Sequence, residues 1–403
     1  MEGDGLVPGE SAQADTLSVA EAARILQVKP STVYAYISRG LLQSERSRGR
    51  SWLSRAAVER FSLRKGTPPE PSPGGSGPGD VTTRVAHIVD DQLFYRGRPA
   101  TELARTHSFE SVAELLWGGR ANATAWVIDA KTVEAVRRLQ AAMPASSLPL
   151  DRIKATTMVL GALDPFRYDL STPSVTSVAR TLAPAFIESL PPAAAPAPSG
   201  RSTAERLWSA LSPGPPLPAD LELMSAALVL CADHGLGPST RAARDAAATA
   251  ADPYSVVLAG TSMASGLLHG GGSSLAVQAW LAEIDSPDQV ARVLGQRLQR
   301  GDGLSGFGQP RYRGPDPRGA MLLAMLPASS ARPERLEIVR AAVDLVIERR
   351  QLQPNVEFAL GALCFAHGMA NGAGEAVFVL ARSAGWIAHA LEEYTLSQVR
   401  GVR

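Results

Sequence analysis

The residues of this chain best suited to chemistry are a histidine, a glutamate and two arginines that lie far apart in the sequence. His269 lies in the run 266–272, where glycines allow backbone and substrate to approach closely. Arg318 and Arg382 carry planar guanidinium groups, which pair two-pronged with carboxylates. Glu357 supplies a carboxylate, a group that can take a weakly acidic proton. These residue types favour a site that binds a small acid and moves a proton.

Four segments around these residues carry motifs. Residues 266–272 read Gly-Leu-Leu-His-Gly-Gly-Gly, and residues 306–318 read Gly-Phe-Gly-Gln-Pro-Arg-Tyr-Arg-Gly-Pro-Asp-Pro-Arg. Residues 232–244 begin Ala-Asp-His-Gly-Leu-Gly-Pro-Ser-Thr, and residues 381–393 begin Ala-Arg-Ser-Ala-Gly-Trp. In order and spacing these segments resemble the citrate synthase family, and the resemblance runs from Thr82 to the C-terminus.

The resemblance implies a reaction and roles for two of the residues. The family joins the methyl carbon of acetyl-CoA to the carbonyl of oxaloacetate, a step of the tricarboxylic acid cycle, and then hydrolyses the thioester. His269 matches the donor to the thioester oxygen, and Glu357 stands where the family has its aspartate base. The extra methylene moves the carboxylate by roughly 1 Å, and such a misplacement can cost about a hundredfold in rate. Glu357 is therefore either a weaker base or a carboxylate at the start of a helix.

Gln309 is the main departure from the family pattern. It stands where the family has a histidine that polarises the ketone and protonates the new alkoxide. A glutamine amide donates a hydrogen bond but cannot release a proton. We therefore expect that binding of a 2-oxo acid persists while turnover falls.

The resemblance also implies substrates and an assembly. Three residues match the family's contacts to oxaloacetate: His234, Arg318 and Arg382. For both of these arginines, an ion pair at the surface is the alternative interpretation. Arg313 matches a residue that faces the phosphates of CoA. The family is a homodimer that takes one arginine from the partner subunit, and here Arg400 and Arg403 are both candidates. The implied partners are a dicarboxylic 2-oxo acid and an acyl-CoA co-substrate, with no permanently bound cofactor and no metal.

The N-terminal part differs in charge from the rest of the chain. Residues 16–66 contain ten Lys and Arg against three Asp and Glu, a balance of +7, while the whole chain carries +1. Ser18 and Glu21 have the spacing of a helix capping box. A second helix ending at Arg39, a basic hairpin at 44–52 and a third helix at 55–63 are expected to follow. This order resembles the winged helix-turn-helix of the MerR and excisionase families.

That resemblance implies binding of duplex DNA, with the second helix in a major groove. The candidate contacts on this helix are Ser31, Thr32, Tyr34, Tyr36 and Arg39. On the hairpin, or wing, the candidates for phosphate or minor-groove contacts are Arg46, Arg48 and Arg50. The alternative is a helix-turn-helix that contacts only protein.

The expected fold is mainly α-helical: a small winged helix-turn-helix domain followed by a two-domain, citrate-synthase-like body. We assign residues 17–65 to the DNA-binding domain and the Pro- and Gly-rich residues 66–79 to a flexible linker. The body comprises a large domain, 81–271 completed by 366–403, and a small domain, 272–365. Helix-period apolar spacing is clearest at 112–117, 153–163, 221–232, 276–284, 336–348 and 376–393. Residues 85–98 are expected to be extended.

The composition points to a cytoplasmic protein. Cys231 and Cys364 lie in apolar, helix-like contexts, which favours buried, reduced thiols over a disulfide or a metal site. The sequence lacks an uninterrupted apolar run of about 18 residues, so we expect no membrane association.

Two functions of different classes remain open. The first is a citrate-synthase-type acyltransferase, slow or retargeted to another 2-oxo acid, and fused to a DNA-binding module. The second is a transcription regulator whose former active site senses a dicarboxylate or an acyl-CoA. His269 and the acidic residue at 357 favour the enzyme, while Gln309 and the basic module favour the sensor.

Overall fold

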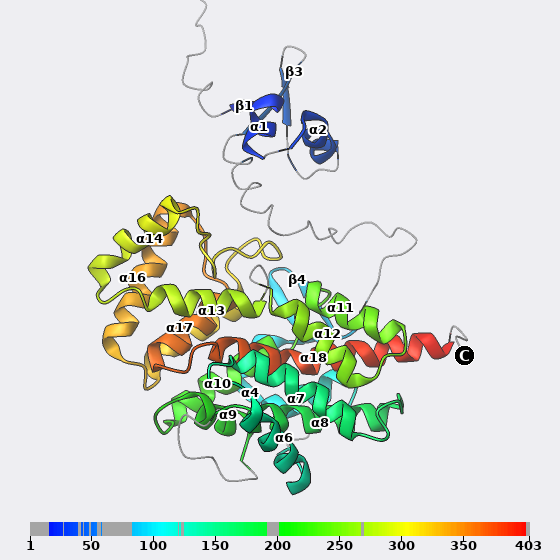
Figure 1. Cartoon of the computed structure of the whole chain (residues 1–403). Coiled ribbons are helices and arrows are strands. Elements are labelled where there is room, and N and C mark those ends of the chain that lie inside the picture. The colour runs from blue at the N-terminus through cyan, green and yellow to red at the C-terminus, as the bar shows by residue number, and fades with distance from the viewer. Residues whose placement is uncertain are drawn as a thin grey trace, which may run out of the picture. The chain divides into compact units, whose positions relative to one another are not determined.

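The structure is a computed structural model, and its contacts divide the chain into two units, Met1–Asp80 and Val81–Arg403 (Figure 1). The residues that it describes are 16–26, 28–38, 42, 44–47, 50–54, 58, 83–119, 121, 125–191, 201–266 and 270–399. Several predicted residues lie outside these ranges: Arg39, Arg48, His269, Arg400, Arg403 and the linker 66–79. For Arg46 and Arg50 the backbone is described and the side chain is not.

The described residues of the first unit form a small sheet and two helices. Its elements are β1 Thr16–Ser18, α1 Val19–Ile25, α2 Pro30–Ser38, β2 Ser44–Ser47 and β3 Arg50–Ser54, and the antiparallel strand order is β1-β3-β2. The predicted capping box is confirmed: the Ser18 amide donates to Glu21 Oε2 at 2.8 Å, and the Glu21 amide donates to Ser18 Oγ at 3.3 Å. The predicted basic hairpin is confirmed as β2 and β3. The predicted third helix lies, apart from Val58, outside the described residues.

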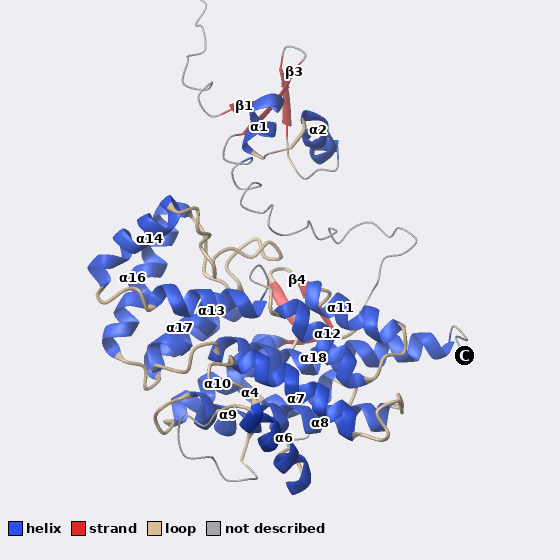
Figure 2. Ribbon diagram, viewed as in Figure 1, coloured by secondary structure: helices blue, strands red, loops and turns tan. Residues whose placement is uncertain are grey.

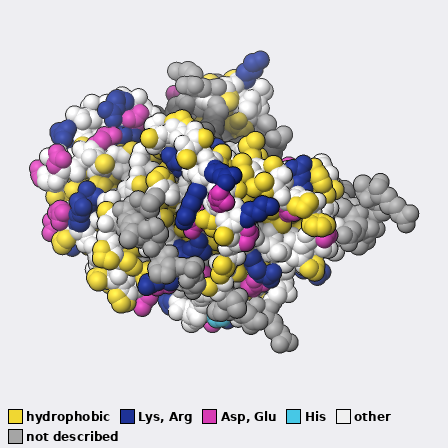
Figure 3. Space-filling model, turned by 60° about the horizontal axis from the view of Figure 1, so that its bottom comes forward, with side chains coloured by type: hydrophobic (Ala, Val, Ile, Leu, Met, Phe, Trp, Pro, Cys, Tyr) yellow, Lys and Arg dark blue, Asp and Glu magenta, His cyan; other side chains and the backbone are white. Residues whose placement is uncertain are grey.

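The second unit begins with a three-stranded antiparallel sheet and continues as helices (Figure 2). The strands are β4 Ala86–Val89, β5 Gln92–Tyr95 and β6 Arg98–Pro99, which confirms the extended stretch predicted at 85–98. Asp90 and Asp91 make the turn between β4 and β5 with positive φ angles of 48° and 58°. On the face shown in Figure 3, side chains of both charge signs are interspersed with hydrophobic ones, as is usual at a water-exposed surface.

The helices of the second unit confirm the predicted mainly α class. The first seven are α4 Ala100–Thr106, α5 Phe109–Leu116, α6 Ala130–Ala142, α7 Pro149–Leu163, α8 Thr172–Glu188, α9 Thr203–Leu211 and α10 Pro218–Cys231. The others are α11 Pro238–Ala248, α12 Pro253–Ala264, α13 Gly270–Leu281, α14 Val290–Gln299, α15 Pro317–Met325, α16 Pro333–Arg350, α17 Val356–His367 and α18 Ala373–Val399. Two short 3-10 helices, η2 Pro287–Gln289 and η3 Leu326–Ala328, lie between them. Among the described residues, none of the helices is long and apolar enough to cross a membrane.

Helix α18 forms the centre of this unit. It contacts α7, α8, α10, α11, α12, α13 and α17, and Figure 1 shows it as the long orange-to-red helix that runs through the body. Gly260 on α12 allows the close approach, because a Cβ atom there would lie 2.5 Å from the ring of the fully buried Trp386 on α18. The first described residues of the body are hydrogen-bonded to the same helix. Thr83 Oγ1 and the Arg84 amide donate to Glu392 of α18 at 2.8 and 2.9 Å. Side chains on α18 are therefore held in fixed positions by neighbours on many sides.

Helices α14 and α16 pack against each other at one end of the body, where α13 and α17 lead to them (Figure 1). Helices α13 and α17 lie very close together. A Cβ atom on Gly361 of α17 would lie only 2.6 Å from Val277 of α13, so this contact requires glycine. The division of the body into a large domain and a small domain at 272–365 stays a prediction.

Candidate active site

The predicted residues of the body that the structure describes come from five places in the chain. His234 follows α10, Gln309 lies in the loop before α15, Arg318 is in the first turn of α15, Glu357 is in the first turn of α17, and Arg382 is in α18. His269 directly precedes α13 and lies outside the described residues.

Backbone contacts hold the loop of Gln309 against the start of α17. The Asn355 amide donates to the Gly306 carbonyl at 2.9 Å, and the Gly308 amide donates to the Gln353 carbonyl at 2.8 Å. The side chain of Asn355 donates to the Gly308 carbonyl at 2.9 Å. Gly306 has a φ of 90°, and a Cβ atom there would lie 2.6 Å from Val277, so this close approach requires glycine. The loop thus brings Gln309 to the end of α17 that carries Glu357.

Asp316 fixes the position of Arg318. Its two oxygens accept hydrogen bonds from Arg318 Nε at 3.0 Å and Nη2 at 2.8 Å, and Oδ2 also accepts from the Val356 amide at 3.1 Å. Arg318 is 2% exposed and Asp316 is 1% exposed. Burial alone would lower the pKa of Arg318, but the Asp316 carboxylate raises it overall, so the guanidinium stays charged. One buried carboxylate therefore orients the arginine and joins the starts of α15 and α17.

Arg382 is the second buried cation of the site. It is 3% exposed, its Nε donates to the Cys231 carbonyl at 2.8 Å, and its guanidinium lies 4.7 Å from the centroid of the Phe378 ring. Burial lowers the pKa of Arg382, and the charge of Arg318 acts in the same direction while Asp233 opposes it. The alternative of a surface ion pair is wrong for both arginines, because both side chains are buried.

Glu357 is a half-buried acid in the first turn of α17. Within the described part of the chain, its Oε2 atom is buried and has no hydrogen-bond partner. Burial raises the pKa of Glu357 above its ordinary value, and the charges of Arg318 and Arg382 offset part of this rise. Glu357 does not cap the helix, because Asn355 Oδ1 accepts from the Phe358 amide at 3.1 Å and is the cap. The unpartnered Oε2 atom disfavours a purely helix-starting role, because a carboxyl oxygen that is buried without a hydrogen-bond partner costs stability.

His234 lies in a turn that its neighbours determine. The Gly235 amide donates to Asp233 Oδ2 at 2.9 Å, and Gly235 has a φ of 65°, a conformation that favours glycine. The ring of His234 is 8% exposed, and its Nε2 atom lies 2.9 Å from Tyr312 Oη. Burial raises the pKa of Tyr312 to about 12. Tyr312 was not among the predicted site residues, although it lies within the motif at 306–318.

Electrostatic interactions among these side chains indicate that they belong to one cluster. Arg318 and Arg382 both act electrostatically on Tyr312 and on Glu357, and Glu357 acts on Arg318 in return. The cluster therefore holds two buried cations, a half-buried acid and a buried tyrosine–histidine pair. Such a cluster can bind an anion with two carboxylates and place a proton acceptor beside it.

Arg313 directly follows Tyr312 in the sequence but does not share its burial. Arg313 is exposed, and its backbone amide donates to Asp91 Oδ1 at 2.7 Å. Within the described residues, no group of three or more His, Cys, Asp or Glu side chains could hold a metal ion.

The predicted DNA-contact residues whose side chains the structure describes lie along α2. Ser31 and Tyr34 are exposed, Tyr34 by 55%, whereas Thr32 and Tyr36 are half-buried. Exposed polar and aromatic side chains on a second helix suit contacts to phosphates or bases.

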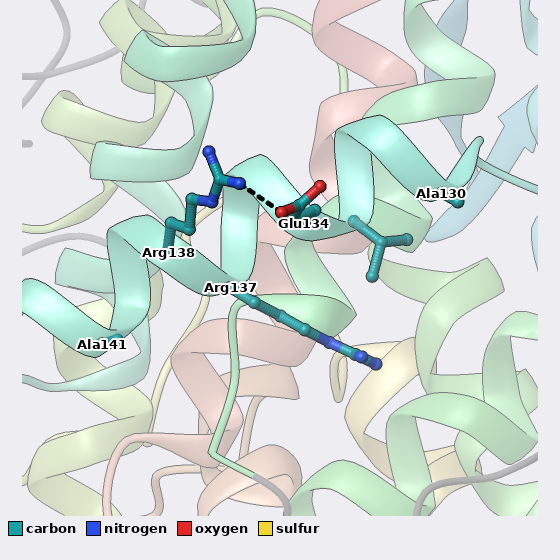
Figure 4. Close-up of a pocket in the computed structure, with 6 residues that line it drawn as sticks. Ala130, Glu134, Arg137, Arg138 and Ala141 are labelled. Carbon is teal, nitrogen blue, oxygen red and sulfur yellow. Dashed lines mark hydrogen bonds and ion pairs between the residues drawn. The ribbon is translucent and has the colours of Figure 1, made fainter.

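A surface hollow lies along α6, and it is lined by none of the residues of the cluster around Arg318 (Figure 4). It is lined by Ala130, Val133, Glu134, Arg137, Arg138 and Ala141, and an ion pair joins Glu134 to Arg138. All six residues come from one helix, so this hollow is no counterpart of the cluster around Arg318.

Two family models match the chain. The model described as "Citrate synthase, C-terminal domain" matches residues 76–403, and a helix-turn-helix domain model matches residues 16–61. Among curated proteins, 2-methylcitrate synthase of Mycobacterium tuberculosis is 30% identical over 336 residues, which cover 78% of this chain and 84% of that protein. Citrate synthase 2 of Bacillus subtilis is 27% identical over 341 residues, covering 78% of this chain and 90% of that protein.

Solved structures show the same relationship. Citrate synthase from Thermoplasma acidophilum, in a ternary complex with carboxymethyl coenzyme A and oxaloacetate, has a TM-score of 0.67 and 25% sequence identity. The match covers 81% of this chain and 92% of that one.

Proposed function

The chain belongs to the citrate synthase family, and from this premise we propose that its body condenses an acyl-CoA with a dicarboxylic 2-oxo acid such as oxaloacetate. The observation that carries the proposal is the position of Glu357. It is a half-buried acid whose buried Oε2 atom has no hydrogen-bond partner among the described residues, and two buried arginines act on it. Such an arrangement suits a base beside a bound dicarboxylate.

Each of these residues then has a separate role in the proposed reaction. Arg318 and Arg382 bind the two carboxylates of the 2-oxo acid, and His234 contributes a further hydrogen bond. Glu357 takes a proton from the carbon next to the thioester, and its raised pKa makes it a stronger base than an exposed glutamate. Gln309 donates a hydrogen bond to the ketone oxygen. His269 donates to the thioester oxygen by analogy with the family.

The acyl-CoA is a co-substrate, and the exposed Arg313 is suited to its phosphates. The similar protein of Thermoplasma acidophilum was solved with a CoA derivative and oxaloacetate, which supports this pair of ligands. We further propose a homodimer in the cytoplasm, with Arg400 or Arg403 reaching the partner's site. Met158 and Leu163 on α7 are 62% and 55% exposed, and Met263 on α12 is 46% exposed. These exposed apolar side chains are candidates for contacts to a second copy.

A specific observation favours the second function, a regulator that senses a ligand. Gln309 cannot release a proton, and the chain carries a helix-turn-helix domain at residues 16–61. In this alternative the same arginines bind the dicarboxylate, and the first unit binds duplex DNA through Ser31, Thr32, Tyr34, Tyr36, Arg39, Arg46, Arg48 and Arg50.

One pair of measurements tests the proposal. The full chain is mixed with acetyl-CoA or propionyl-CoA and oxaloacetate, and release of the CoA thiol is followed in time. Calorimetry with each ligand alone measures binding. We expect both thiol release and binding of oxaloacetate. Binding without thiol release would favour the regulator, and the absence of both would reject the dicarboxylate site.

A further inference from the structure

The substitution at position 309 leaves the proposed reaction short of one proton donor. The condensation turns a ketone oxygen into a hydroxyl, and an amide side chain cannot supply that proton. We propose that Tyr312 supplies it, as a catalytic residue that takes over the task of a histidine at 309. This inference rests on the proposed function.

Tyr312 lies close to the residues that bind the 2-oxo acid. Its Oη atom is 2.9 Å from Nε2 of His234, and the guanidinium carbon of Arg318 is 6.0 Å from the centroid of its ring. The Tyr312 amide donates to the Gln309 carbonyl at 3.3 Å, so the two side chains leave the same turn. A hydroxyl group therefore exists within one turn of the position where the proton donor is missing.

The surroundings keep this hydroxyl protonated and available. Tyr312 is 6% exposed, and burial raises its pKa to about 12. The charges of Arg318 and Arg382 act against that rise, which means that they stabilise a tyrosinate when it forms. The phenol is consequently neutral at physiological pH, and its anion is stabilised by the cations that hold the substrate.

The step balances in protons and electrons. Glu357 takes a proton from the carbon next to the thioester, and the resulting enolate carbon forms a bond to the ketone carbon. The π electrons of the ketone move to its oxygen, which takes the proton of Tyr312 Oη. Tyrosinate and the protonated Glu357 then exchange a proton through water, which restores both groups. Water hydrolyses the thioester of the product, and the broken C–S bond yields a carboxylate, a proton and the CoA thiol that the assay measures.

A structural role is the competing explanation. The tyrosine hydroxyl would then serve as a hydrogen-bond partner for the buried ring of His234. The two roles differ in what a histidine at 309 does: it replaces a missing proton donor, but it does not repair a lost contact to His234.

The test uses four forms of the full chain: wild type, Tyr312→Phe, Gln309→His and the double variant. Thiol release gives kcat and KM, and calorimetry gives the Kd of oxaloacetate. We expect Tyr312→Phe to lower kcat by about 10²–10⁴-fold, the usual effect of a positioned acid, and to change the Kd of oxaloacetate by less than about fivefold. In the Gln309→His background the same change should cost less than about fivefold.

The pH profile gives a second readout. A tyrosine donor keeps kcat up to strongly alkaline pH, whereas the double variant, whose donor is the histidine alone, should lose rate above the histidine range near pH ~6.5. The proposal is overturned if Tyr312→Phe turns over as fast as the wild type, or if the double variant is as slow as Tyr312→Phe. A silent wild type beside an active Gln309→His would remove Tyr312 as donor and leave the condensation chemistry standing. Loss of both activity and oxaloacetate binding in all four forms would reject the proposed function itself.

Discussion

Replacement of Arg318 by alanine should destabilise the body strongly and abolish its response to a dicarboxylate. Asp316 is 1% exposed, and the substitution removes both guanidinium hydrogen bonds, at 3.0 and 2.8 Å. The carboxylate keeps the amides of Arg318 and Val356 as donors but loses its buried counter-charge. Removing one partner of a buried ion pair costs about 3–5 kcal/mol, so we expect a loss of that size.

A double variant separates the lost ion pair from the lost ligand contact. Arg318→Met combined with Asp316→Asn removes both charges and leaves one amide donor poorly paired, for which we expect a loss of about 1–3 kcal/mol. Arg137→Ala serves as a control on the surface, because Arg137 pairs with Glu188 at 3.0 Å but its side chain is 65% exposed (Figure 4). Such exposed pairs contribute about 0–1 kcal/mol.

Urea unfolding followed by tryptophan fluorescence reports on the body, which contains five of the six tryptophans. Oxaloacetate at a hundred times its Kd should add ~2.7 kcal/mol to the wild type and to Arg137→Ala. It should add nothing to either Arg318 variant. Ligand stabilisation that survives in the double variant would show that Arg318 does not bind the dicarboxylate. A stability of Arg318→Ala within 1 kcal/mol of the wild type, with ~3–5 expected, would refute the reasoning about the buried pair.

Three further predictions concern other parts of the chain. Glu357→Gln should lower thiol release by at least about a hundredfold while oxaloacetate still raises the melting temperature, and unchanged turnover would contradict its role as base. Glu375, 3% exposed, has a pKa raised by burial from 4.5 to about 7, so the folded state holds its proton more tightly than the unfolded chain. Stability should therefore decrease as pH rises from 4.5 to 7, and Glu375→Gln should raise the melting temperature at pH 8 but hardly at pH 4.5; equal shifts at both pH values would contradict this. Full-length protein should bind duplex DNA with an affinity that falls steeply with salt, and replacing Arg46, Arg48 and Arg50 by alanine should flatten that dependence in a mobility-shift titration. Absence of binding at low salt would exclude the DNA-binding role.

Apolar periodicity located the middle of several helices better than their starts. The predicted helices at 153–163, 221–232 and 336–348 begin at Pro149, Pro218 and Pro333 in the structure. Proline is favoured in the first turn of a helix, because the N–H groups of that turn have no acceptor within the helix. It does not contribute to the periodic pattern of apolar residues from which these helices were predicted. The start signal is therefore the proline itself rather than the periodic pattern.

The candidate site was predictable as residue types but not as contacts. Motif spacing identified Arg318 and Arg382, yet their burial depends on Asp316, which lies two residues away, and on the Cys231 carbonyl, which lies 151 residues away. Tyr312 was missed because its significance depends on the distance to His234, a contact across 78 residues. Such distances follow from how α10, α15 and α18 pack, and a pattern of residue types does not encode them.

Glu357 and Gln309, the two departures from the family pattern, differ in how readily evolution can restore the family's residue. Asp316 and the Val356 amide tie position 357 into a buried scaffold, so an exchange of glutamate and aspartate there must be accommodated by the packing of α17. The side chain at 309 lies half-exposed in a loop whose contacts to α17 come from the backbone of its neighbours. A lineage can exchange histidine and glutamine at that position in one step with little change in folding stability. The fold thereby allows the side chain at 309 to change while the cluster around Arg318 and the helix-turn-helix domain at residues 16–61 are inherited unchanged.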